Sequence, residues 1–229
     1  MKTVAIHQPN FLPWLGYFYK MAYADVFVLL NNVLHSKKSY TNRVKIKTPN
    51  GIRRLTVPLA KKEILIKDIP IANDSKWNKK HIKLIHDSYS KATYFNDYYP
   101  QLEEIFLKQW DFLVDFNISN IIFLKKAFNL QTELIRSSEL SALSEDKNQR
   151  NLSICKELNG DIYLSGDGGG RQYNMEALFK EEGLEVRYSN FRHPVYQQLW
   201  GDFEKGLSSI DLIFNYGPES PRILTEGEQ

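Results

Sequence analysis

The apolar residues of the chain fall into short strand-like runs that alternate with segments of helical spacing. Residues 3–7 and 25–30 form two apolar runs, and a segment with helical spacing at 15–23 joins them. Pro9 and Pro13 end the first run in a turn, because proline is excluded from helix interiors and central strands. This order predicts a β-turn-α-β unit at the start of the chain.

The next segment predicts a β-hairpin. Residues 39–47 alternate between polar and apolar positions, residues 53–59 form a second strand-like run, and Asn50-Gly51 lies in the turn between them. Asn-Gly between two strand-like runs is a typical hairpin signal. A further short strand is predicted at 64–71.

Helical patterns dominate the middle of the chain and alternate with strands again towards its end. The expected helices cover 76–90 (capped by Ser75), 98–109, 112–128, a segment from Ser144 to 158, a segment ending at 182, and 207–214; the expected strands cover 131–136, 161–164 and 184–188. The pattern predicts one α/β domain over residues 1–229, with a mostly parallel sheet, a β-hairpin and a helical insertion at about 75–129.

Composition narrows the class of protein. Apolar residues make up 42% of the chain, and no apolar run approaches the ~18 residues that span a membrane. The opening apolar stretch is too short for a signal peptide. The single cysteine, Cys155, excludes an intramolecular disulfide, and neither HExxH nor a Cys/His pair occurs. We therefore expect a cytoplasmic protein with no membrane insertion and no metal.

The net charge of +3 conceals an uneven distribution. Residues 36–91 carry 15 Lys and Arg against 4 Asp and Glu, whereas the rest of the chain carries 15 against 23. A basic region of this kind favours an anionic partner such as a phosphate, a nucleotide or RNA. The alternative is a solvated lysine-rich hairpin and helix.

The first candidate site follows the first strand. Ligands of open α/β sheets bind beyond the carboxyl ends of the strands, where His7 and Gln8 are expected. His7 can act as a general base and Gln8 can orient a carbonyl, while Gly16 permits close backbone approach. Trp14 and Tyr17 are candidates for stacking on a base or sugar. The alternative is a rigid turn that packs aromatic side chains.

Two further segments suggest anion binding. In the basic hairpin, Lys38, Asn42 and Arg43 can clamp a diphosphate, although Asn42 and Arg43 point to opposite faces of a regular strand. The second segment is a glycine loop between a strand and a helix, where backbone amides can cradle a phosphate or oxyanion. Its candidate residues are Ser165, Gly166, Gly168 and Gly169.

The segment from 191 to 198 supplies the leading candidate for a general base. His193 precedes Pro194, which holds the backbone extended, and imidazole titrates near neutrality. Tyr196 and Gln198 follow as candidate substrate contacts. The alternative is a hydrogen-bonded histidine in a tight turn.

Long stretches of the chain resemble one protein family, the WbqC-like family. They are HQPNFLPWLGYFYKMAYADVFVLLNNV from residue 7, SKKSYTNRVKIKTPNG from 36, LTVPL from 55, WNKKH at 77–81, RSSEL at 136–140, YLSGDGGGRQY at 163–173, FRHPVYQQLWGDF at 191–203 and LSSIDLIFNYG at 207–217. The resemblance covers nearly the whole chain. It also marks His81 and Tyr173 as candidate ligand contacts.

The resemblance implies an enzyme of bacterial O-antigen or surface-glycan biosynthesis. It implies transfer of an acyl or aminoacyl group, such as glycyl, to an amino-sugar nucleotide. The expected co-reactant is an activated acyl donor, with aminoacyl-tRNA as one form, rather than a bound cofactor. One departure concerns Asn31-Asn32, which stand where the family usually has an Asp.

Two alternatives remain at this stage. The opening unit distantly resembles HIGH-type nucleotidyltransferases and related ATP-dependent ligases, but Tyr17 follows Gly16 where those proteins have a histidine. The second alternative is a non-catalytic protein that binds a nucleotide sugar. The oligomeric state is not indicated by the sequence.

Overall fold

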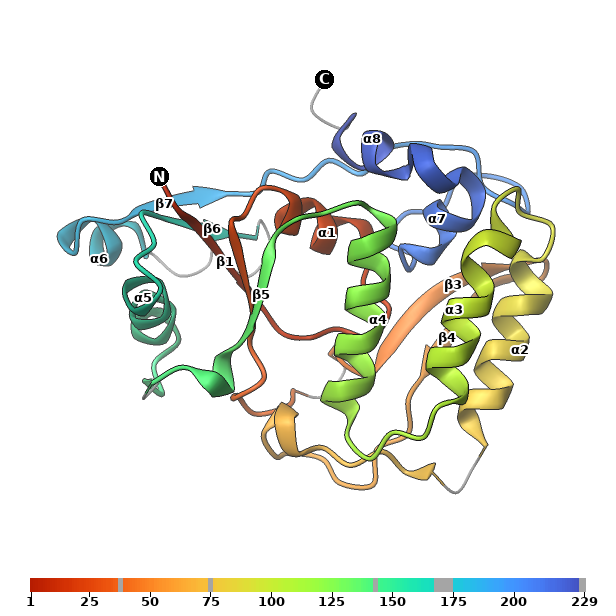
Figure 1. Cartoon of the computed structure of the whole chain (residues 1–229), viewed down its shortest axis with the longest axis horizontal. Coiled ribbons are helices and arrows are strands. Elements are labelled where there is room, and N and C mark those ends of the chain that lie inside the picture. Colours follow the sequence, from red (N-terminus) through yellow and green to blue (C-terminus); the bar gives the residue numbers. More distant parts are fainter. Residues whose placement is uncertain (37–38, 74–75, 142–143, 167–174, 227–229) are drawn as a thin grey trace.

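The computed structural model describes residues 1–36, 39–73, 76–141, 144–166 and 175–226. Its centre is a five-stranded parallel sheet with the strand order β5-β2-β1-β6-β7 (Figure 1). The strands are β1 (Thr3–His7), β2 (Val26–Leu29), β5 (Glu133–Arg136), β6 (Ile162–Ser165) and β7 (Glu185–Tyr188). All four residues of β2 are buried, as is typical of parallel strands covered on both faces.

Helices cover the two faces of the sheet. Helix α1 (Leu15–Ala22) packs on one face, and α5 (Lys147–Glu157) and α6 (Glu176–Glu181) lie on the other (Figure 1). Because side chains alternate along a strand, Val4 of β1 joins the core beside α5 while Ala5 joins the core beside α1. Cys155 is fully buried in the α5 core.

A second group of elements lies between β2 and β5 in the chain. It contains the antiparallel hairpin of β3 (Arg43–Thr48) and β4 (Gly51–Thr56), the 3-10 turn η1 (Ile66–Asp68), and the helices α2 (Trp77–Tyr89), α3 (Phe95–Leu107) and α4 (Leu113–Ala127). The carboxyl ends of the sheet strands point towards this group (Figure 1). Apolar side chains of both groups belong to one continuous core cluster.

The last described elements follow an extended segment that contacts α1 and the hairpin. An extended segment leaves β7 and leads to α7 (Ile210–Tyr216), η4 (Gly217–Glu219) and α8 (Ser220–Thr225). Within this segment the Ser208 amide donates to the Lys45 carbonyl oxygen at 2.9 Å, and Ser208 also forms an isolated bridge with Trp14. The segment therefore joins the hairpin to the start of α1.

The predicted α/β fold with a parallel sheet and a hairpin is confirmed, and three local expectations need correction. The predicted strand at 64–71 is instead η1, flanked by isolated bridges. The cap of α5 is Asp146 rather than Ser144, because the Asp146 carboxylate accepts from the amides of residues 148 and 149. Helix α8 was not expected, and Ser75 lies outside the described residues. None of the helices described here is long and apolar enough to cross a membrane.

Candidate functional site at the carboxyl edge of the sheet

The strand order reverses between β1 and β6. The chain runs outward from β1 through β2 to β5, and then returns to the other side of β1 to form β6 and β7. Ligands of open α/β sheets bind at such a reversal, beyond the carboxyl ends of the strands. His7 ends β1 and Ser165 ends β6, so two of the predicted segments meet there.

His7 is half-buried among aromatic rings. Its ring centroid lies 4.8 Å from that of Tyr17 and 6.5 Å from that of Phe27. Burial and then the positive charge of Lys20 hold the pKa of His7 well below its ordinary value of 6.5. His7 is therefore neutral at pH 7 and able to accept a proton.

Lys20 is a buried cation beside His7 that sequence reasoning missed. Its side chain is 4% exposed, and its Nζ donates to the Ile6 carbonyl oxygen at 2.8 Å and lies 5.7 Å from the Phe27 ring centroid. Buried lysines are rare without partners and often have a function. The available signal was one charged residue within the apolar stretch from Leu15 to Ala24.

Tyr17 belongs to the core and does not face a ligand. Its side chain is fully buried, and its hydroxyl has no hydrogen-bond partner among the described residues. Burial raises the pKa of Tyr17 well above 10.0. The ring instead packs against the ring of His7, with the two planes tilted by 55°.

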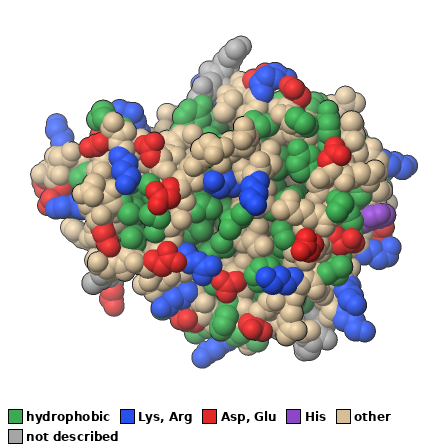
Figure 2. Space-filling model, viewed as in Figure 1, with side chains coloured by type: hydrophobic (Ala, Val, Ile, Leu, Met, Phe, Trp, Pro, Cys, Tyr) green, Lys and Arg blue, Asp and Glu red, His purple; other side chains and the backbone are tan. Residues whose placement is uncertain are grey.

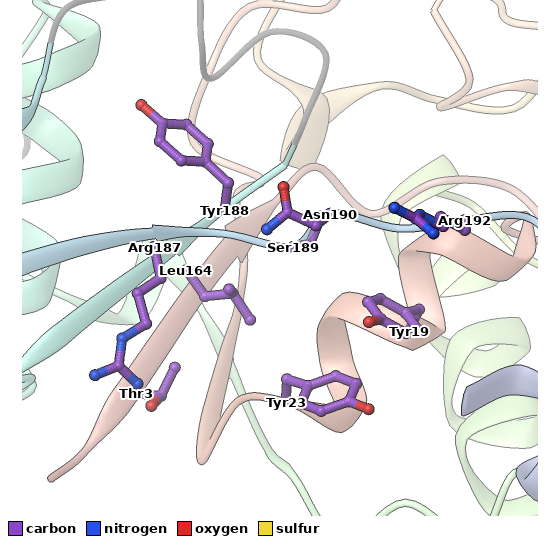
Figure 3. A pocket seen from close by; sticks show the side chains of 9 residues that line it. All are labelled: Thr3, Tyr19, Tyr23, Leu164, Arg187, Tyr188, Ser189, Asn190 and Arg192. Atoms are coloured by element: carbon purple, nitrogen blue, oxygen red, sulfur yellow. The ribbon is translucent and has the colours of Figure 1, made fainter. Parts of the chain in front are cut away.

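A pocket of about 530 Å³ opens on the same face of the sheet as α1, which we call the sheet-face pocket (Figure 3). Leu164 and Arg187 point from β6 and β7 towards this side, and Tyr19 of α1 and Tyr23 directly after this helix lie opposite. Its lining residues are Thr3, Tyr19, Tyr23, Leu164, Arg187, Tyr188, Ser189, Asn190 and Arg192. Sequence reasoning identified none of them.

The pocket and His7 share one face of the sheet. Ala5, Leu164 and Arg187 are paired across β1, β6 and β7. His7 lies two residues after Ala5 on the same strand, so its side chain points to the same face of the sheet. Among the described residues, no atom lies within 4 Å of the position that a Cβ on Gly166 would occupy.

The turn after β1 is built by internal packing. Gln8 is half-buried directly after His7. The Trp14 ring lies over Gly16, where a Cβ would approach two of its ring atoms to 2.4 Å, and it contacts Phe191 edge-on at 5.3 Å. Glycine at 16 is therefore required by Trp14, a contact within the chain.

Ser165 faces away from His7. It is 1% exposed and belongs to the face that carries α5, where Tyr163 accepts a hydrogen bond from Asn151 at 3.1 Å. Its carbonyl oxygen accepts from the Ser189 amide at 2.9 Å, so Ser165 contributes backbone rather than hydroxyl to the edge. The predicted contacts Lys38, Gly168, Gly169 and Tyr173 lie outside the described residues.

His193 and His81 are held by backbone groups. The Gly206 amide donates to His193 Nε2 at 3.2 Å, and His193 Nδ1 lies 2.9 Å from the Pro194 carbonyl oxygen. His81 Nε2 lies 3.0 Å from both the amide and the carbonyl oxygen of Thr56. Burial is the main cause that lowers the pKa of both histidines. Both ring nitrogens of His193 are therefore occupied by backbone groups in this arrangement.

The other predicted contacts lie away from His7. Asn42 is buried and donates to the Val57 carbonyl oxygen at 3.0 Å, whereas Arg43 lines a separate groove on the hairpin. Gln198 accepts from Lys47 Nζ at 3.2 Å in a buried polar cluster with Asp211, and Tyr196 lies beside the same carboxylate.

Asn31 is part of a hydrogen-bond network that joins the ends of β2 and β5. Its Oδ1 accepts from the Ser137 hydroxyl and the Ser138 amide, both at 3.0 Å, and its Nδ2 donates to the Ser138 hydroxyl at 2.9 Å. A carboxylate at position 31 could not donate this last bond, and the Ser138 hydroxyl would have to donate to it instead. The amide of Asn31 both accepts and donates in this network.

The fold and this edge define a doubly wound α/β protein with a candidate ligand site where its strand order reverses. The chain belongs to the WbqC-like protein family, whose model matches residues 8–223. It is 32% identical over 232 residues to the uncharacterized protein Rv1507c of Mycobacterium tuberculosis (strain ATCC 25618 / H37Rv), with 98% of each chain covered. No solved structure matches the chain.

Proposed function

We propose that this protein is a transferase that moves an acyl or aminoacyl group, such as glycyl, onto the amino group of a nucleotide-linked amino sugar. The proposed setting is the cytoplasmic assembly of bacterial surface glycans such as O-antigen. One observation supports it above the others: a neutral histidine and a pocket large enough for a small molecule share one face of the sheet at the reversal of strand order.

The pocket has the chemistry to hold a nucleotide. Tyr23 is 42% exposed and packs against Tyr19 with ring centroids 4.8 Å apart, which offers an aromatic surface for a base. Arg192 makes no ion pair or hydrogen bond within the described part of the chain, so its guanidinium is available for a phosphate. Arg187 is held in place by Glu185 through bonds of 2.6 and 2.8 Å.

In the proposed reaction, the sugar amine attacks the carbonyl carbon of the activated acyl donor. A C–N bond forms, and the carbonyl electron pair moves to oxygen. His7 takes the proton that the nitrogen loses, and when the tetrahedral intermediate collapses the bond to the leaving group breaks and His7 returns the proton to that group. A histidine of low pKa suffices, because the nitrogen becomes strongly acidic as it attacks. Backbone amides from Gly166 onward are the proposed donors to the oxyanion.

The test is a reaction of the purified protein with an amino-sugar nucleotide and an activated acyl donor, followed by mass spectrometry of the sugar nucleotide. We expect the added acyl mass without ATP. His7→Gln should lower turnover by about 100-fold or more. The control is His86→Gln, which changes an exposed histidine on α2.

Three outcomes would overturn the proposal. Product that requires ATP and magnesium, with release of AMP or diphosphate, would identify a ligase. Binding of the sugar nucleotide with no product from any donor class would identify a non-catalytic binding protein. Equal loss of turnover in the His7 and His86 variants would remove His7 from the reaction.

A further inference from the structure

The hairpin carries a second cavity that shares no residue with the sheet-face pocket. This groove of about 350 Å³ is lined by Tyr40, Arg43, Val44, Lys45 and Arg54, and we call it the hairpin groove. Tyr40 is 61% exposed at its edge. Three of the five lining side chains are cations, and none of them makes an ion pair within the described residues.

The strand register places two of these cations directly opposite each other. Lys45 of β3 pairs with Arg54 of β4, and Arg43 lies two residues before Lys45 on the same face of β3. Directly opposed like charges destabilise a sheet. In addition, Arg43 Nε is buried and has no hydrogen-bond partner among the described residues. An anion in the groove would relieve the repulsion and supply the missing acceptor.

The spacing of the cations selects the size of the anion. Arg43 and Lys45 are separated by about 7 Å along the strand, which is longer than one phosphate group. Two linked phosphates can reach Arg43 at one end and the Lys45–Arg54 pair at the other. Tyr40 offers an exposed ring to a base next to them.

We infer that the hairpin groove binds a nucleoside diphosphate, with the phosphates on Arg43, Lys45 and Arg54 and the base against Tyr40. The inference does not depend on the transferase proposed above, because the two cavities have no lining residue in common. The basic charge of residues 36–91 is not confined to the groove. The exposed lysines of α2 extend it along the edge of the molecule on the right of Figure 2. A test must therefore separate the groove from general positive charge.

Isothermal titration calorimetry with ADP and with inorganic pyrophosphate provides that test. Arg54→Gln removes a cation from the groove, and Arg53→Gln removes the neighbouring cation, which points to the opposite face of β4. We expect Arg54→Gln to weaken binding of both probes at least tenfold, and Arg53→Gln to change it less than twofold. Tyr40→Ala should weaken the binding of ADP more than the binding of pyrophosphate.

Thermal melting supplies an independent measurement that does not require tight binding. Without ligand, Arg54→Gln should melt at or above the wild-type temperature, because it removes the opposed charges. Pyrophosphate should raise the wild-type melting temperature more than that of the variant. Absence of binding by wild type, or equal losses in the Arg53 and Arg54 variants, would overturn the inference. Tighter binding of an RNA oligonucleotide than of ADP, reduced equally in both variants, would assign this face to RNA instead.

Discussion

The Tyr89 hydroxyl donates a hydrogen bond of 3.0 Å to Oδ2 of Asp211, and both side chains are buried. Burial raises the pKa of Asp211 from 3.8 to about 6, although the Tyr89 hydroxyl and the charge of Lys47 act in the opposite direction. The other carboxylate oxygen, Oδ1, has no partner among the described residues. A carboxyl group that lacks one partner is costly to ionise inside the protein.

This relationship predicts how stability depends on pH. The folded state binds the Asp211 proton more tightly than the unfolded state does. This difference stabilises the folded state fully below pH 3.8, and the stabilisation is lost as pH rises towards 6. The loss is on the order of 2–3 kcal/mol. Urea unfolding of wild type and Asp211→Asn at pH 4.5 and 7.5 measures this loss. The free energy of unfolding should fall less between the two pH values in the variant than in wild type.

A surface carboxylate provides the control for that experiment. Asp87 is exposed, and the hydrogen bond from Lys83 lowers its pKa, so its contribution to stability is lost as pH falls rather than as it rises. Asp87→Asn should therefore change the pH dependence of the free energy of unfolding in the opposite direction to Asp211→Asn. If both variants change it in the same direction, Asp211 is not the buried acid that the structure indicates.

The pKa of His7 should rise when Lys20 loses its charge. Lys20 is the charged group that lowers this pKa, after burial, so Lys20→Met removes one of two causes and leaves the other. NMR titration of the His7 ring protons measures the change, and the transferase assay should show its acidic limb at higher pH in the variant. An unchanged His7 titration in a folded Lys20→Met protein would show that the ammonium does not act on the ring.

His193 should matter for stability and not for turnover. Its Nε2 accepts a hydrogen bond from the Gly206 amide, and its Nδ1 contacts the Pro194 carbonyl oxygen. The ring packs between Phe191 and Phe203, with centroid distances of 5.6 and 5.4 Å. His193→Ala should cost about 1–3 kcal/mol by leaving backbone groups unpaired. Chemical denaturation and turnover per folded molecule are the two measurements. A stable variant that loses turnover would return the general base to His193.

Local pattern predicts the elements of this fold well. The Asn50-Gly51 signal indicates the hairpin, and the observed turn has Gly51 at a φ of +90°, where glycine is favoured. Apolar runs that end at glycines predict the strands and helices at the carboxyl edge of the sheet. The predicted strand at 64–71 failed because its apolar residues are buried by packing around η1 rather than by pairing in a ladder.

The candidate site was only partly predictable. His7 and Gly166 were identified because strand ends are visible in the sequence. The sheet-face pocket was missed, because Leu164 and Arg187 face Tyr19 and Tyr23 only after β6 and β7 pair beyond β1. The hydrogen bond between His193 and Gly206 was not predictable either, because the two residues are 13 positions apart and no local pattern records that contact.

Two glycines should respond in opposite ways to the same substitution. A Cβ at Gly16 would lie 2.4 Å from two atoms of the Trp14 ring and 3.0 Å from Phe191, so the ring has no room to retreat. Gly16→Ala should therefore destabilise the protein by about 1–3 kcal/mol. A displaced Trp14 ring should shift the wavelength of tryptophan emission, measured for wild type and variant under conditions where both are folded to the same extent.

Gly166 has no such neighbour among the described residues, and its φ lies outside the left-handed region, so alanine fits its backbone. Gly166→Ala should change the free energy of unfolding by less than about 1 kcal/mol. In the proposed reaction, however, the added methyl group takes up space at the end of β6 that the substrate needs between the sheet-face pocket and His7. Turnover should fall about tenfold or more, because small displacements of a substrate are costly for catalysis. A Gly166→Ala protein with unchanged stability and unchanged turnover would show that the pocket and His7 do not serve the same ligand.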